Sequence, residues 1–174
     1  YAGKRPQDYH PVGLTWDTPG AGPPEQRLRE LDIDGLDAEI LYPDPGARNI
    51  FRGVKGPDAY RAVLRAYNDY LAEEYCAIAP DRLLGLGLIP ETGVDDAIAE
   101  MEHCAKLGHK GVLLSTFPSG HAYPSEEDDK FWAAALDMKM PLTVHVAFDA
   151  QAAQRGEPVF KYPRKPPEEL GVAT

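Results

Sequence analysis

The chain has 174 residues, enough for one ordinary domain, and 43% of them are apolar, which is typical of a globular protein. Its 18 Lys and Arg against 28 Asp and Glu give a net charge of −10. That balance argues against nucleic-acid and membrane partners, because phosphate groups are bound by clustered cations. No apolar run approaches the roughly 18 residues that a membrane-spanning helix needs. Two cysteines, Cys76 and Cys104, are too few for a disulfide framework, so a reducing cytoplasm is the expected location.

Composition divides the chain into three regions. Residues 1–24 are rich in Pro and Gly and are expected to form a loop segment. Residues 25–150 carry the strand and helix patterns of the domain. Residues 151–174 are again rich in Pro and read as a loop or a truncated tail.

The first half of the domain predicts two helices and a strand. The segment 24–34 opens with Pro-Pro-Glu and is followed by Gly35, which favours a helix with a glycine at its end. A short strand is expected at 38–43. Apolar residues at spacings of three and four predict a long helix over 57–79, ended by Pro80.

The second half continues the alternation. The continuous apolar run at 83–90 predicts a strand covered on both faces. A helix at 94–108, a strand at 111–115, a helix opening at Ser125 and a strand at 142–146 follow.

Strands that alternate with helices predict a parallel α/β sheet. Four such units are half of a (β/α)8 TIM barrel, which needs roughly 200 or more residues when complete. The alternative architecture is a small open doubly wound sheet with helices on both faces.

Parallel α/β folds bind ligands at the carboxyl ends of their strands. His145, near the end of the fourth predicted strand, is the strongest acid–base or metal-binding group there, although a buried structural histidine is the alternative. Phe117 and His121 follow the third strand and are candidates for substrate contact. His103 and His109, at the far end of a helix, are expected to be solvated.

Six segments in order resemble one enzyme family. They are similar to the amidohydrolase-related metal enzymes, a family of hydrolases and decarboxylases that includes aminocarboxymuconate-semialdehyde decarboxylase and the resorcylate-type decarboxylases. The segments are 27–43, 67–71, 82–90, 108–112, 131–132 and 141–145.

The resemblance implies a TIM barrel that holds one divalent metal, zinc or manganese, and acts on a small carboxylated or cyclic substrate. By this resemblance, the four predicted strands correspond to strands two to five of the family's barrel. His145 then matches the family's metal ligand after the fifth strand. The family's His-x-His pair, its later His and its Asp have no counterpart here. The chain is therefore expected to be a segment of a longer enzyme, inactive alone, since a catalytic zinc normally has three protein ligands.

The expected partner is a small molecule, and a homo-oligomer is compatible with the sequence. Two other functions stay open. One is a non-catalytic half-barrel module whose open sheet edges pair with another chain. The other is a flavodoxin-like small-molecule binder, which strand order distinguishes from a barrel.

Overall fold

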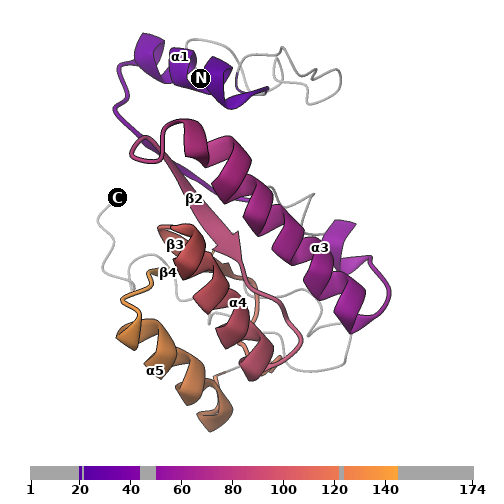
Figure 1. Cartoon of the computed structure of the whole chain (residues 1–174). Coiled ribbons are helices and arrows are strands. Elements are labelled where there is room, and N and C mark those ends of the chain that lie inside the picture. Colours follow the sequence, from indigo (N-terminus) through magenta and orange to yellow (C-terminus); the bar gives the residue numbers. More distant parts are fainter. Residues whose placement is uncertain (1–19, 21, 44–49, 122–123, 145–174) are drawn as a thin grey trace, which may run out of the picture.

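The computed structural model describes residues 20, 22–43, 50–121 and 124–144 and shows one curled parallel sheet with helices packed on it (Figure 1). The four strands lie in the order β1-β2-β3-β4, and every neighbouring pair is parallel. This consecutive order is that of a partial TIM barrel. It excludes the flavodoxin-like alternative, in which the first two strands exchange places.

The strands are β1 (Glu39–Leu41), β2 (Leu83–Leu88), β3 (Gly111–Leu114) and β4 (Leu142–Val144). The α-helices are α1 (Pro24–Asp34), α3 (Pro57–Tyr70), α4 (Val94–Leu107) and α5 (Asp129–Asp137). The remaining elements are the π-helix η2 (Leu71–Tyr75) and the 3-10 helices η3 (Cys76–Ile78) and η4 (Glu126–Asp128).

The elements agree with those expected from the sequence, with shorter strands. Gly35 ends α1 in the left-handed conformation, and Ser125 forms a capping box with Asp128 where the last helix begins. The predicted helix 57–79 is continuous but changes its winding after Tyr70, where η2 and η3 replace regular α-helix. The last two residues of the strand expected at 142–146 lie outside the described residues.

Helices cover one face of the sheet, and glycines in β2 let these helices pack close to the strand. A side chain at Gly85 would meet Leu71 and Cys76. A Cβ at Gly87 would lie 2.4 Å from Sγ of Cys104 on α4, which is closer than packed atoms tolerate. The glycines inside β2 therefore serve helix packing, and α4 sits against the strand because Gly87 carries no side chain.

The opposite face is concave. Thr143 is paired in register with Leu113, and paired residues of parallel strands project to the same side. In a flat sheet β1 and β4 would be about 14 Å apart, three strand spacings. The hydroxyl of Tyr42, directly after β1, nevertheless lies 3.1 Å from Oγ1 of Thr143. The sheet must therefore curl as a barrel wall does.

Asn68 of α3 replaces a missing strand beside β2. Strand β1 pairs with β2 only as far as Gly85, so among the described residues Leu88 has no strand neighbour on that side. The Asn68 amide nitrogen donates to the Leu88 carbonyl at 2.9 Å, and the Leu88 N–H donates to the Asn68 side-chain oxygen at 2.8 Å. The same amide nitrogen donates to Glu100 at 2.8 Å. Asn68 is fully buried, so these bonds satisfy groups that water does not reach.

The expectation that His109 is solvated is wrong. Its side chain is buried, with Nδ1 at 3.2 Å from the Gly85 carbonyl and Nε2 at 3.0 Å from the Asn68 carbonyl. Gly108 takes a left-handed conformation that turns the chain back toward the sheet after α4. His103 is half-buried and lies 2.5 Å from Asp69, so it is also not a free surface group.

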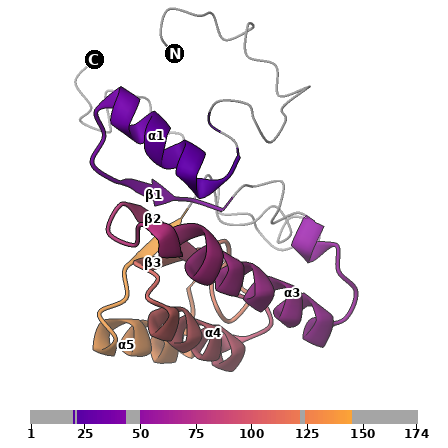
Figure 2. The ribbon, with the colours of Figure 1, turned by 45° about the horizontal axis from the view of Figure 1, so that its top comes forward.

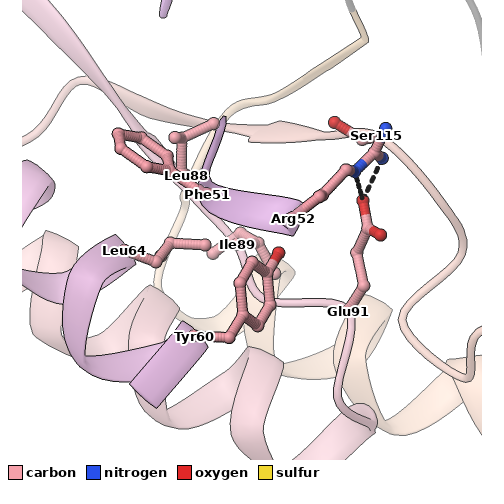
Figure 3. A pocket seen from close by; sticks show the side chains of 8 residues that line it. All are labelled: Phe51, Arg52, Tyr60, Leu64, Leu88, Ile89, Glu91 and Ser115. Carbon is pink, nitrogen blue, oxygen red and sulfur yellow. Dashed lines mark hydrogen bonds and ion pairs between the residues drawn. The ribbon is translucent and has the colours of Figure 1, made fainter. Parts of the chain in front are cut away.

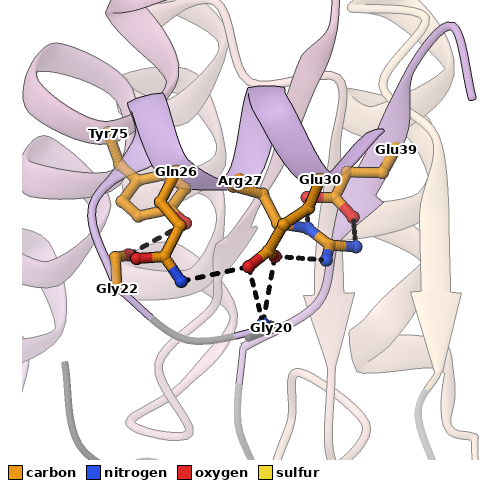
Figure 4. Close-up of polar contacts among 7 residues, drawn as sticks. All are labelled: Gly20, Gly22, Gln26, Arg27, Glu30, Glu39 and Tyr75. Carbon is orange, nitrogen blue, oxygen red and sulfur yellow. Dashed lines mark hydrogen bonds and ion pairs between the residues drawn. The ribbon is translucent and has the colours of Figure 1, made fainter. Parts of the chain in front are cut away.

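Helix α1 is tied to the sheet by charge. Arg27 binds the Glu39 carboxylate through Nε at 2.7 Å and through a second nitrogen, and it also reaches Glu30 at 3.3 Å (Figure 4). Hydrogen bonds from Gln26 and from the Gly20 backbone N–H hold the pKa of Glu30 below its usual value. This network fixes α1 at the β1 edge of the sheet.

Asn68→Ala is expected to lower the free energy of unfolding by about 2–4 kcal/mol, because it leaves the N–H and carbonyl of Leu88 unpaired in the interior. Chemical denaturation measures the change. Glu73→Ala, on the exposed side of η2, is the control and is expected to shift stability by no more than about 0.5 kcal/mol. Equal stabilities of the Asn68→Ala and Glu73→Ala variants would contradict the role given to Asn68.

Candidate functional site

The carboxyl ends of the four strands meet at one edge of the curled sheet (Figures 1 and 2). Tyr42 follows β1, Glu91 lies three residues after β2, and Ser115 and Thr116 follow β3. Ser115 and Thr116 are buried, whereas Tyr42 is 46% exposed. This edge is where parallel α/β folds place their ligands, so these residues define the candidate site.

Arg52 and Glu91 join two of the loops at this edge. Arg52, from the segment after β1, donates to Oε1 of Glu91 through Nε at 3.1 Å and through a second guanidinium nitrogen (Figure 3). Both side chains are less than one-fifth exposed. A pair so shielded from water is stronger than a surface pair and holds the two loops at a fixed separation.

A small cavity of about 10 Å³ lies next to this ion pair, with room for roughly one water molecule. Burial and the neighbouring Glu91 carboxylate raise the pKa of Tyr60 to about 12, so its phenol stays neutral at neutral pH. Figure 3 shows the Tyr60 ring beside Ile89 and the ion pair above it. The residues that line the cavity are Phe51, Arg52, Tyr60, Leu64, Leu88, Ile89, Glu91 and Ser115.

The concave face has an apolar floor and a polar rim. Leu86 is paired beside Gly111, two residues before Leu113 on β3, and both leucines are buried. Ser115 and Tyr42 lie beyond this floor at the carboxyl edge. Leu113 is 0% exposed and packs with Leu64 and Leu88, so these leucines belong to the packed interior of this face.

Of the three site residues proposed from the sequence, the structure describes two. His145 lies outside the described residues. The Phe117 ring makes an edge-to-face contact with Trp132 of α5, at 6.5 Å between centroids and 89° between planes. His121 is exposed, and its Nε2 lies 3.6 Å from the Glu127 carboxylate at the start of the last helix. Both residues are in the segment after β3, and their contact with substrate stays a prediction.

Sequence reasoning missed Arg52, Tyr60 and Glu91. Glu91 follows the strand-ending Pro90, so a stricter search of strand ends would have included it. Tyr60 lies within the helix predicted over 57–79, where the apolar spacing indicates only a packing role. Arg52 carries no local signal, because its partner Glu91 is 39 residues away in the chain.

The described residues do not by themselves make a metal site. Within this part of the chain, no three His, Cys, Asp or Glu side chains lie together in a way that would hold a metal ion. The two thiols are buried, and burial raises the pKa of both Cys76 and Cys104. They are packing residues. Nor does any helix in the described ranges have the length and apolar character to cross a membrane.

Residues 6–164 match the family model described as Amidohydrolase. The match covers most of the 174 residues, and the chain belongs to this amidohydrolase family. This result confirms the resemblance drawn from the six sequence segments.

Several of the similar proteins are decarboxylases. Decarboxylase orsB of Emericella nidulans is 29% identical over 92 residues, which are 52% of this chain and 27% of that protein. The crystal structure of 2,6-dihydroxybenzoate decarboxylase from Rhizobium is 26% identical, with a TM-score of 0.58, and the match covers 76% of this chain and 43% of that one.

A third similar protein has a metal in its crystal structure. Dihydroxybenzoic acid decarboxylase from Polaromonas sp. JS666, solved with manganese and the inhibitor 2-nitroresorcinol, is 25% identical with a TM-score of 0.59. The match covers 75% of this chain and 41% of that one. The chain thus spans less than half the length of each of these three proteins and has a decarboxylase-like amidohydrolase fold.

The Tyr60 phenol predicts a specific dependence of stability on pH. Its pKa is raised from 10.0 to about 12 in the folded state, so its stabilising contribution is complete below pH 10 and is lost as the pH rises through about 12. Unfolding free energies of wild type and Tyr60→Phe are expected to converge across this window. Glu91→Gln removes a negative charge that raises the pKa of Tyr60. This variant is therefore expected to lose the Tyr60 contribution over a narrower pH range than wild type does. Parallel pH profiles for wild type and Tyr60→Phe would contradict this assignment.

Proposed function

We propose that this chain is part of a metal-dependent decarboxylase that acts on a small aromatic carboxylic acid. The observation that carries the proposal is the curled parallel sheet of four strands with Tyr42, Glu91 and Ser115 at its carboxyl edge, where barrels of this kind place their ligands. The similarity to dihydroxybenzoate decarboxylases, at 25–26% identity over three-quarters of the chain, supports decarboxylation over hydrolysis.

The reaction replaces the bond between a ring carbon and its carboxylate by a bond to hydrogen. Carbon dioxide leaves, the bonding electrons stay on the ring carbon, and that carbon takes up a proton. The polar side chains at the carboxyl edge suit the oxygen substituents of such a ring. In the proposed complex, Phe117 and His121 contact the substrate from the segment after β3.

His145 is proposed as one ligand of the divalent metal. It is two residues after Thr143, and side chains two apart along a strand project to the same face. Thr143 is within hydrogen-bonding distance of Tyr42 across the concave face, which supports the inward direction of that side of β4. Manganese in the Polaromonas relative supports manganese as the first metal to test.

A second candidate function is a module that binds other polypeptide through the β4 edge. Leu142 and Val144 are 37% and 43% exposed, and Leu136 of α5 is 77% exposed, which is unusual for side chains of this size beside a sheet. In a complete barrel these side chains would be covered by the next strand and helix. The first proposal therefore explains the same observation.

The intact natural protein, loaded with manganese, is expected to release carbon dioxide from 2,6-dihydroxybenzoate. His145→Ala is expected to lose bound manganese, measured by elemental analysis, together with at least about 100-fold in activity, because removing a metal ligand disrupts the site. His103→Gln is the matched control: its imidazole pairs with Asp69 on the helix layer, so metal content and activity are expected to remain. Full metal content in His145→Ala would refute its assignment as a ligand.

A further inference from the structure

We infer that Asp128 is a positioning residue, whose carboxylate holds the segment after β3 in place at the carboxyl edge of the sheet. The inference rests on the proposed function, in which Phe117 and His121 of this segment contact the substrate. Asp128 is the last residue of η4 and is 0% exposed, although it carries an acidic group. Burial of a carboxylate is unfavourable unless hydrogen bonds satisfy it, so its partners indicate what it does.

The two oxygens of Asp128 bind two different parts of the chain. Its Oδ2 accepts from the backbone N–H of Ser125 at 2.9 Å and from the Ser125 hydroxyl at 3.3 Å. Its Oδ1 accepts from the backbone N–H of Ser119 at 2.8 Å. Ser119 lies nine residues before Asp128, in the turn that follows β3. One side chain therefore joins the start of the last helix to the segment after β3.

The start of the helix accounts for only one of these oxygens. In a capping box, a side chain in the first turn of the helix reaches back to the N–H of the capping residue, and Oδ2 of Asp128 does this for Ser125. The capping box does not use Oδ1. The bond to Ser119 is therefore an additional contact, and it fixes the segment after β3 on a helix that packs against the sheet through Phe131.

The segment is a tight turn that Asp128 holds from the helix side. The Gly120 N–H donates to the Phe117 carbonyl at 2.8 Å, and Gly120 has a φ of 81°, in the left-handed region. Pro118, inside the turn, is fully buried. The turn follows Thr116, which is buried at the end of β3. The position of the turn is thus set from both ends, by the strand and by Asp128.

This restraint is expected to act on substrate binding. A turn that is already held in place loses less entropy when a ligand binds than a turn that is free to move. Release of the turn is therefore expected to raise KM and to change kcat little. Asp128→Asn releases it, because the amide nitrogen of asparagine cannot accept a hydrogen bond from the N–H that a carboxylate oxygen binds.

The test uses the intact natural protein, loaded with manganese, and 2,6-dihydroxybenzoate as substrate. Asp128→Asn is expected to raise KM about five- to tenfold, with kcat within about twofold of wild type and manganese content unchanged. Hydrogen exchange, measured by mass spectrometry, is expected to become at least about tenfold faster in residues 117–121 and to stay the same in α4. Asp128→Glu keeps both carboxylate oxygens and is expected to lie closer to wild type in KM and in exchange.

Asp129→Asn is the matched control, because Asp129 is an exposed carboxylate at the next position, where α5 begins. It is expected to change neither KM nor hydrogen exchange, which separates the contact with Ser119 from the effect of negative charge at the helix start.

Three results would overturn the inference and leave the proposed function standing. The first is a folded Asp128→Asn variant with the KM of wild type. The second is a raised KM without faster exchange in residues 117–121. The third, which decides the matter if Asp128→Asn does not fold, is exchange of residues 117–121 in wild type as fast as in an unprotected loop. If wild type does not decarboxylate the aromatic acid, the proposed function fails, and the role of Asp128 in substrate binding fails with it.

Discussion

The described structure depends on the hydrogen bonds that the carboxyl-terminal half of β2 makes on the side where β1 no longer pairs with it. Strand β1 has three residues and β2 has six, so a backbone N–H and carbonyl at Leu88 face a helix instead of a strand. The Asn68 side chain pairs with both, and no other uncharged side chain both donates and accepts in this way except glutamine. Because β1 stops early, the space beside Leu88 is filled by Phe51 and Leu64, and the cavity with Arg52 and Glu91 forms there.

The polar groups at the carboxyl edge are positioned by contacts between loops and strands far apart in the chain. The Arg52–Glu91 pair links the segment after β1 to the one after β2, and the Tyr42–Thr143 hydrogen bond spans the whole curled sheet. Each contact holds a side chain that a loop alone would leave free to rotate. Such restraint is what a binding site needs, because an ordered site loses less entropy when a ligand binds.

The amidohydrolase family and the barrel order together constrain the chemistry more than either does alone. A half-barrel can serve many reactions, since function in this fold is set by the loops at one end. The similarity to decarboxylases is what favours one reaction class in the proposed function.

The sequence by itself determined the alternation of strands and helices, because apolar spacing, Pro80, Gly35 and the Ser125 capping box are local signals. Only the tertiary structure decided that His109 is buried and that Arg52 meets Glu91, since those partners are 24 to 41 residues away. The burial of His109 and the pairing of Arg52 with Glu91 depend on which strands become neighbours in the sheet. No local pattern of residues in the sequence determines the order of those strands.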